Sequence, residues 1–169
     1  MRVPSEFLQQ DAVELAQQLI GKTLVRKFED GTELRKIITE TEAYCGEEDL
    51  ACHASKGRTA RTEVMYHQGG KVYVYLIYGI HWMLNFVCGI ENKPQAVLIR
   101  GINKISGPGR VGKALKIDKS FYGEDTHSSQ RIWIEDTYPQ KKHMIKRDRR
   151  IGIDYAGEVW ANKLWRFYI

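Results

Sequence analysis

Two glutamates separated by one residue give this sequence its clearest chemical feature. Glu40, Glu42 and Tyr44 alternate along a segment rich in β-branched residues, and His53 follows them. In a β-strand, side chains alternate between two faces, so both glutamates and Tyr44 would share one face with Ile38. A face that passes from an aliphatic residue to carboxylates and a phenol fits a general-base site at the edge of a core. The same pattern also fits a strand end that meets solvent.

A second group of candidate residues lies in the aromatic segment Val72–Phe86, where tyrosines alternate with β-branched and aliphatic residues. This pattern predicts a β-hairpin whose turn falls at Tyr78–Gly79. Aromatic residues in strands most often belong to a core. A tyrosine beside a turn glycine instead projects from the hairpin tip, where a large exposed aromatic side chain requires a partner.

Basic residues are concentrated in three stretches, Lys56–Arg61, Arg100–Lys119 and Lys141–Arg150, in a chain whose formal net charge is +5. Clustered cations favour an anionic partner. Nucleic acid is favoured over a membrane surface, because no basic helix has a clean apolar face. The stretch Lys141–Arg150 is interpreted as a solvated face rather than a site.

Length and composition set the class of protein. With 169 residues, of which 43% are hydrophobic and 28% charged, the chain is expected to form one domain over residues 1–169. No apolar run has the length of a membrane span or the form of a signal peptide. Three cysteines without metal-ligand spacing indicate reduced, intracellular thiols and no metal site.

The candidate residues are positioned by elements that the apolar periodicity predicts. Asp11 is expected to cap a helix that ends at Gly21. Asp30–Gly31 is expected to join two strands, Lys22–Glu29 and Thr32–Tyr44, so that the glutamates lie on the second arm of a hairpin. Further predicted elements are a helix opened by Ser106–Arg110, whose N–H groups suit a phosphate, and strands at Gln95–Arg100, Arg131–Ile134, Arg150–Ile153 and Trp165–Ile169.

These parts fit one reaction. Tyrosine faces can stack on a planar base, and a carboxylate held near an arginine can activate a water molecule. A protruding aromatic side chain can fill the gap left by an extruded nucleotide. The residues are therefore compatible with hydrolysis of a glycosidic bond on a flipped base.

Several segments, taken in order, resemble the alkyladenine (3-methyladenine) DNA glycosylases. The resemblance covers nearly the whole chain, and its co-linearity is more specific than any one motif. The segments that carry it are Glu40–Tyr44, His53, Val72–Gly79 with Asn85, Ser106–Arg110, Arg150–Glu158 and Trp165–Tyr168.

The resemblance implies an α+β fold, in which a single compact domain holds a curved, mostly antiparallel sheet with flanking helices and a protruding, DNA-inserting hairpin. It implies a monofunctional glycosylase without cofactor or metal, which uses water and forms no Schiff base. The implied partner of a monomeric enzyme is double-stranded DNA containing damaged purines, with no membrane involved. Such an enzyme would be cytoplasmic and nucleoid-associated in bacteria, or nuclear in eukaryotes.

Site residues also follow from the resemblance. Glu42 matches the general base, Arg100 the residue that positions the attacking water, and the main-chain carbonyl of Ile151 a third contact to that water. The remaining matches are Tyr44 and Tyr75 as stacking walls, His53 at the base edge and its 5′ backbone, Asn85 against the amino group of guanine, and Tyr78 in place of the extruded nucleotide. The basic loop and the helix start place Arg58, Arg61, Gly109 and Arg110 as expected contacts to the DNA backbone.

Three other functions stay open on the residues alone. Pro108–Ala114 superficially resembles the hairpin of helix-hairpin-helix repair enzymes, with Lys113 as the nucleophile, but the preceding segment Val97–Arg100 reads as a strand. A non-catalytic module that binds damaged DNA would show a similar basic, aromatic surface. A small-molecule enzyme on a similar sheet, such as a formyltransferase-like domain, is the third alternative.

Overall fold

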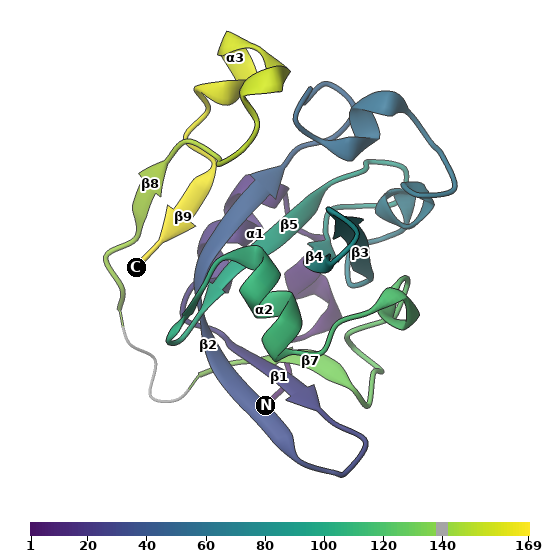
Figure 1. The fold of residues 1–169 in the computed structure, drawn as a ribbon, viewed down its shortest axis with the longest axis vertical. Helices are drawn as coiled ribbons and strands as arrows, with labels where there is room; N and C mark the ends of the chain where they lie inside the picture. The colour runs from purple at the N-terminus through teal and green to yellow at the C-terminus, as the bar shows by residue number, and fades with distance from the viewer. Residues whose placement is uncertain (138–141) are drawn as a thin grey trace.

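An antiparallel sheet with the strand order β3-β4-β5-β2-β1-β7 organises the molecule, and β2 crosses its middle (Figure 1). The computed structural model describes residues 1–137 and 142–169. Its strands are β1 (Thr23–Lys27), β2 (Glu33–Tyr44), β3 (Val72–Ile77), β4 (His81–Val87), β5 (Ala96–Ile102), β6 (Ile105–Ser106), β7 (Ile132–Glu135), β8 (Lys146–Asp148) and β9 (Arg166–Tyr168). Its helices are α1 (Ala12–Leu19), α2 (Pro108–Ala114) and α3 (Glu158–Ala161), with short 3₁₀ turns η1 (Ser5–Gln9), η2 (His53–Lys56), η3 (Glu63–Tyr66), η4 (Lys119–Phe121) and η5 (Asp154–Ala156). The mostly antiparallel α+β fold expected from the sequence is therefore confirmed.

Local sequence signals explain why β2 lies where it does. Asp30 accepts hydrogen bonds from the backbone and hydroxyl of Thr32 at 2.9 and 2.6 Å, which closes the turn between β1 and β2. Asp11 caps α1 by accepting from the Val13 amide at 3.0 Å, as expected. The buried Thr41 hydroxyl donates to the Ala16 carbonyl at 2.7 Å, so α1 is fixed to the face of β2 opposite the glutamates.

The pairing of β2 with β5 is irregular next to the glutamates. Glu42 pairs with Leu98 and Glu40 with Gly101, and the register shifts on both sides of Glu40. A Cβ at Gly101 would lie 3.0 Å from the Glu40 Cβ, so the absence of a side chain allows this close approach. Both carboxylates nevertheless reach the Arg100 guanidinium, which confirms that they share a face.

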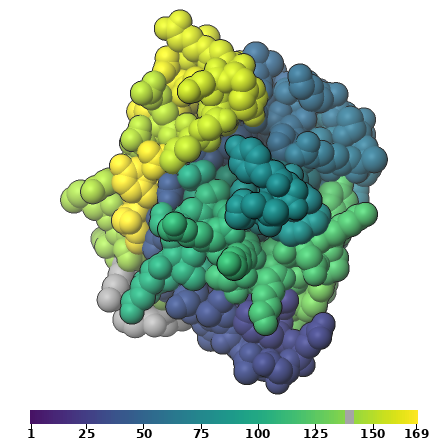
Figure 2. All heavy atoms as spheres, in the orientation of Figure 1, coloured from purple at the N-terminus to yellow at the C-terminus, as the bar shows by residue number. Residues whose placement is uncertain are grey.

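The aromatic segment forms the β3–β4 hairpin that the sequence predicts. Three residues, Tyr78–Ile80, join the two strands, and Tyr78 and Gly79 both have positive φ angles, 53° and 68°, a backbone that is uncommon for tyrosine. The Tyr78 side chain is 89% exposed. In the space-filling view this hairpin lies near the centre of the visible face, below the yellow C-terminal segment (Figure 2).

Helix α2 packs on β4 through glycine. A Cβ at Gly112 would lie 2.0 Å from the Trp82 carbonyl oxygen, and one at Gly109 would lie 3.1 Å from the His81 ring. Only a residue without a side chain permits this contact between helix and strand. The first turn of α2 is thereby held beside the hairpin.

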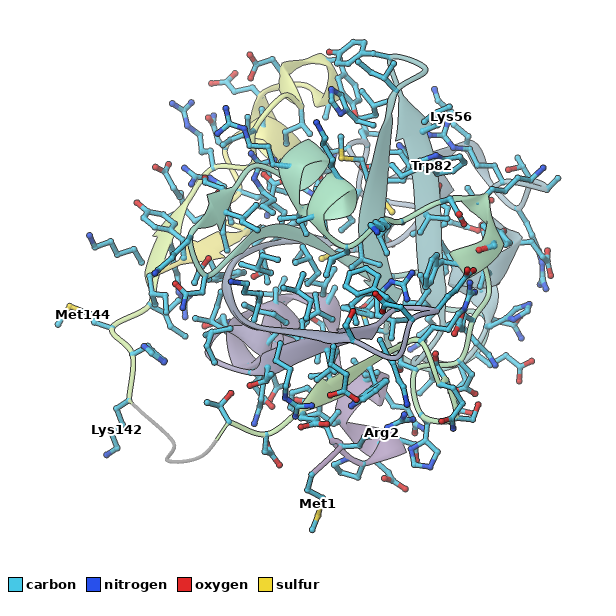
Figure 3. All side chains as sticks on the ribbon, turned by 60° about the horizontal axis from the view of Figure 1, so that its bottom comes forward. Met1, Arg2, Lys56, Trp82, Lys142 and Met144 are labelled. Atoms are coloured by element: carbon cyan, nitrogen blue, oxygen red, sulfur yellow. The ribbon has the colours of Figure 1, made fainter. Side chains whose placement is uncertain are left out.

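One expectation for the C-terminal part was wrong, and another needs a qualification at its last residue. Arg150–Ile153 is not a strand: the sheet is closed instead by β9, which pairs with β2, and by β8, which pairs with β9. The described part of Lys141–Arg150 is largely exposed, as expected, but it contains β8 and ends in a buried arginine. Lys141 lies outside the described residues, whereas Lys142 and Met144 project from the body of the molecule (Figure 3).

Two smaller points complete the comparison with the sequence. Strand β5 continues past Arg100 to Ile102, where β6 pairs with it. Among the described residues, no helix has both the length and the apolar character needed to cross a membrane.

Gly112→Ala tests the packing of α2. Alanine favours a helix by about 1 kcal/mol relative to glycine, but its Cβ would overlap the Trp82 carbonyl. We therefore expect a loss of about 1–3 kcal/mol in the free energy of unfolding, measured by urea denaturation. The control is Lys113→Ala at the next, exposed position, which should change stability by less than about 0.5 kcal/mol. Equal or greater stability of Gly112→Ala would contradict this packing.

Candidate active site

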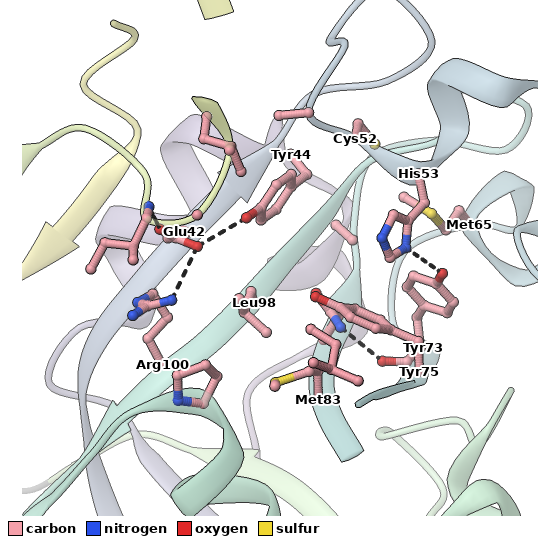
Figure 4. Close-up of a pocket in the computed structure, with 18 of the residues that line it drawn as sticks. Glu42, Tyr44, Cys52, His53, Met65, Tyr73, Tyr75, Met83, Leu98 and Arg100 are labelled. Carbon is pink, nitrogen blue, oxygen red and sulfur yellow. Dashed lines mark hydrogen bonds and ion pairs between the residues drawn. The ribbon is translucent and has the colours of Figure 1, made fainter. Parts of the chain in front are cut away.

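A cavity of about 230 Å³ opens on the same face as the hairpin, and most of the predicted site residues line it (Figure 4). Its walls come from β2, β3, β4 and β5, from η2, from the start of α2 and from the loop after β8. The predicted residues that line it are Glu42, Tyr44, His53, Arg61, Tyr75, Asn85, Arg100 and Ile151.

Glu42 is the buried acid of this cavity. One carboxylate oxygen accepts from the Tyr44 hydroxyl at 2.9 Å, and the other accepts from the Ile151 amide at 2.6 Å. An Arg100 nitrogen lies 3.5 Å from the first oxygen. Burial raises the pKa of Glu42 above its ordinary value, and the positive charge of Arg100 and the two donors oppose that rise. The expected contact of the Ile151 carbonyl is to the attacking water, whereas the Ile151 amide makes a separate contact, to Glu42 itself.

Glu40 occupies a different environment from Glu42, although both pair with Arg100. Its carboxylate lies 3.2 Å from the Arg100 Nε and 3.2 Å from an Arg166 nitrogen. It does not belong to the cavity lining, whereas Glu42 does. Of the two glutamates, which strand alternation leaves equivalent, only Glu42 reaches the cavity.

Aromatic rings form the wall opposite Glu42. The His53 ring lies edge-on to Tyr75, with 4.5 Å between ring centroids, and the His53 Nδ1 lies 2.8 Å from the Tyr73 hydroxyl. Burial and the nearby charge of Arg61 lower the pKa of His53 to about 4, so its imidazole is neutral at physiological pH. Asn85 is buried beneath this wall and donates to the Tyr73 carbonyl at 3.2 Å.

The predicted DNA-facing residues lie outside or at the edge of the cavity. Tyr78 is at the tip of the hairpin, whose Ile77 and Met83 line the cavity. Arg61 is exposed at the cavity mouth, with its guanidinium 5.4 Å from the Tyr75 ring centroid. Arg61 and the hairpin residues Ile77 and Met83 therefore border the same cavity.

The other residues predicted to contact the DNA backbone differ in whether their positive charge is already paired within the protein. The Arg58 guanidinium makes two hydrogen bonds of 2.8 Å to Glu63, so its charge is already paired. Arg110 is exposed in the first turn of α2 and makes no ion pair or side-chain hydrogen bond within the described part of the chain. Gly109, in the first turn of α2, lies against the His81 ring of β4.

Two residues behind the cavity were missed as site residues from the sequence. Arg150 and Asp49 form an ion pair with two hydrogen bonds, of 2.6 and 3.0 Å, and both side chains are fully buried. Arg150 ends a basic stretch that was interpreted as a solvated face, and Asp49 ends an acidic segment for which no site was predicted. Local sequence carries no signal for their pairing, which joins positions 101 residues apart.

The site does not match the helix-hairpin-helix alternative. The segment before α2 is the strand pair β5–β6 rather than a helix, and Lys113 does not line the cavity. Within residues 1–137 and 142–169, no group of three or more histidine, cysteine, aspartate or glutamate side chains could hold a metal ion.

Comparison with known proteins identifies the family. The model of the methylpurine-DNA glycosylase family matches residues 6–106 and 103–169. A relative from Natranaerobius thermophilus is 44% identical, over 100% of this chain and 96% of its own length. Relatives from Psychrobacter cryohalolentis and Methanocella arvoryzae are 43% and 42% identical, over 92% and 98% of this chain and 86% and 91% of their own. All three carry 3-methyladenine DNA glycosylase as a provisional name. Since the match extends over nearly the full length of the chain, this protein belongs to the methylpurine-DNA glycosylase family.

Proposed function

We propose that this protein is a monofunctional glycosylase of base-excision repair, which flips a damaged purine out of double-stranded DNA and hydrolyses its N-glycosidic bond. In this proposal one domain, residues 1–169, acts as a monomer. The observation that carries the proposal is a buried, arginine-paired glutamate, Glu42, facing an aromatic wall inside a cavity next to an exposed tyrosine.

In the proposed reaction Glu42 acts as the general base. It takes a proton from a water molecule as that water attacks C1′ of the deoxyribose, and the base departs as the C1′–N bond breaks. The positive charge of Arg100 keeps the carboxylate ionised and orients it. Lys113 lies outside the cavity, which supports hydrolysis by water rather than a covalent lysine intermediate.

The aromatic wall suits purines that carry a positive charge. Alkylation at N3 or N7 makes a purine cationic and a good leaving group, and cations favour electron-rich rings by about 0.5–2 kcal/mol per contact. Tyr44 and Tyr75 would provide such faces, with the neutral His53 at the base edge. A cavity of about 230 Å³ lies below the ~300–1,000 Å³ of pockets for drug-sized ligands, which suits one base.

We infer the substrate range from the same features. 3-Methyladenine and 7-methylguanine would leave as cationic bases, whereas hypoxanthine and ethenoadenine would need protonation to leave as readily. Asn85, buried beneath the wall, would disfavour the amino group of normal guanine. Tyr78 would occupy the gap left in the duplex, and Arg58, Arg61, Arg110 and the backbone at Gly109 would contact the DNA phosphates.

Glu42→Gln tests the general base. The amide keeps the shape of the side chain but cannot accept the proton, so base release from a duplex containing hypoxanthine should fall about 10²–10⁴-fold under single-turnover conditions. Binding to the same duplex should be retained. Glu40→Gln is the matched control, because Glu40 pairs with Arg100 without lining the cavity, and its loss should be much smaller. Undiminished release by Glu42→Gln would rule out the assignment.

The pH dependence of the rate should follow the ionisation of Glu42. Burial raises its pKa above the ordinary value of 4.5, and only the ionised form accepts a proton. For 7-methylguanine, already cationic, the single-turnover rate should fall with decreasing pH and reach half its maximum above pH 4.5. His53, with a pKa of about 4, should add no transition between pH 5 and 8. A rate for 7-methylguanine that stays flat down to pH 4.5 would refute this role.

The pH profile for hypoxanthine should differ in shape. Its release is assisted by protonation of the base, so its rate should rise with acidity until Glu42 itself is protonated, and the profile should be bell-shaped.

Tyr78→Ala tests insertion into the duplex. Removing one stacked aromatic side chain should weaken binding to the lesion-containing duplex by about 1–3 kcal/mol. At subsaturating enzyme this corresponds to a fall of about 5–150-fold in the excision rate. The side chain is exposed, so the free energy of unfolding should change by less than about 0.5 kcal/mol. Excision from a single-stranded oligonucleotide, which needs no gap to be filled, is the control and should change little. Equal losses on both substrates would contradict an inserting role.

A further inference from the structure

The buried Arg150 side chain joins the elements that surround Glu42. Besides its two hydrogen bonds to Asp49, it donates to the carbonyl of Ala43 at 2.9 Å and to that of Trp160 at 3.3 Å. Its guanidinium carbon lies 4.9 Å from the centre of the Tyr44 ring. It lies equally close, at 4.9 Å, to a second ring, that of Trp165. One side chain thus links the end of β2, the turn that follows it, α3 and the segment that leads into β9.

Asp49 holds this arginine in place and is itself fixed by the backbone. Its two oxygens accept from the amides of Cys45 and Ala51, at 3.0 and 3.1 Å. All four of these interactions of the Asp49 carboxylate, two with Arg150 and two with amides, are buried or nearly so. The pair is therefore a rigid anchor rather than a surface ion pair.

Both hydrogen-bond donors to Glu42 depend on this anchor. Ile151, whose amide donates to one Glu42 oxygen, is joined to Arg150 by a peptide bond. Tyr44, whose hydroxyl donates to the other oxygen, has its ring beside the Arg150 guanidinium. A displacement of Arg150 would move both donors at once.

The energetic cost of the pair argues against a role in folding alone. Replacing a buried ion pair with apolar residues is often neutral for stability or favourable. The Arg150 Nε is, in addition, a buried donor without a hydrogen-bond partner among the described residues. Such an orphan donor costs about as much as a lost hydrogen bond, so the pair is better explained by what it positions.

We propose that Arg150, anchored by Asp49, is a positioning residue for base excision: it fixes the Ile151 amide and the Tyr44 hydroxyl so that they orient the Glu42 carboxylate towards the cavity. This inference rests on the proposed function, in which Glu42 is the general base. Arg150 is not part of the cavity lining and acts only through its neighbours.

The charged and hydrogen-bonding groups that face Glu42 determine how its pKa should respond when Arg150 is replaced. Arg100 remains in every variant, so the strongest attraction on the carboxylate is kept. Loss of the two oriented donors should still destabilise the ionised form and raise the pKa of Glu42. The titratable and charged groups around Glu42 are Arg100 on β5, Tyr44 and Glu40 on β2, Tyr75 on β3, and Arg150 and Tyr155 in the segment after β8.

The test uses Arg150→Met and the double variant Asp49→Leu with Arg150→Met in the full chain. The single variant leaves Asp49 buried without a partner and risks misfolding. The double variant removes both charges together and fills the space with apolar atoms, but it leaves the Cys45 and Ala51 amides without their acceptor, so its fold is first verified by circular dichroism. The double variant also removes the charge of Arg150, which itself lowers the pKa of Glu42. Lost positioning is therefore read from the fall in rate at a pH where Glu42 is ionised in both proteins, and the titration serves to fix that pH.

Three measurements separate positioning from stability. In the double variant, the single-turnover rate of hypoxanthine release should fall about ten- to a hundredfold, the loss expected when hydrogen bonds to a charged group are weakened. Affinity for the lesion duplex should stay within about threefold. The midpoint of the Glu42 carboxyl titration, followed by ¹³C NMR, should move to higher pH.

Arg26→Met is the matched control for loss of a buried arginine. Arg26 donates to the Leu115 carbonyl at 2.8 Å and does not line the cavity, so this variant should leave the Glu42 titration unchanged whatever it does to stability. A double variant with the rate and the Glu42 titration of the unmodified protein would overturn the inference. If the unmodified protein releases no base while the titration still shifts, the proposed function fails and the link between Arg150 and Glu42 stands.

Discussion

The burial of a carboxylate is the constraint on which this site depends. Glu42 lies in the middle of the sheet with no exposed side-chain surface, where an unpaired charge would be very costly. The protein offsets that cost with an arginine from β5, a hydroxyl from β2 itself and an amide from the loop after β8. These partners come from three parts of the chain, so the fold as a whole has to form before the carboxylate can be ionised in its place.

The positions of the strands and the helix around the cavity depend on close contacts between backbone segments. Gly101 lets β2 and β5 approach at Glu40, and Gly112 lets α2 lie on the Trp82 carbonyl. The first contact places both glutamates around Arg100, and the second keeps the start of α2 beside the β3–β4 hairpin. Glycines at close approaches, rather than special loops, thus bring the acid, the aromatic wall and the exposed Tyr78 to one face of the molecule.

Much of the fold could be predicted from local sequence, because its signals are local. The cap at Asp11, the turn at Asp30–Gly31 and the alternating hairpin Val72–Phe86 all lie where expected. Arg150–Ile153 was assigned wrongly as a strand, since a short apolar run after basic residues has the same pattern in a strand and in a loop that covers a core. The basic stretch before it is largely exposed, as expected, except for its last residue, because charge alone does not reveal that Arg150 has a buried partner.

For the site, the sequence by itself determined the residue types and their place in local elements: a carboxylate pair on one strand face, tyrosines on a hairpin and an arginine on a neighbouring strand. Strand alternation could not distinguish Glu40 from Glu42, because it gives both the same face, and only the resemblance to the family selected Glu42. Only the tertiary structure decided that Glu42 reaches the cavity and that Glu40 pairs with Arg100 and Arg166 instead. It also revealed the anchor between Asp49 and Arg150, because an interaction between distant positions depends on how the elements pack and leaves no trace in local spacing.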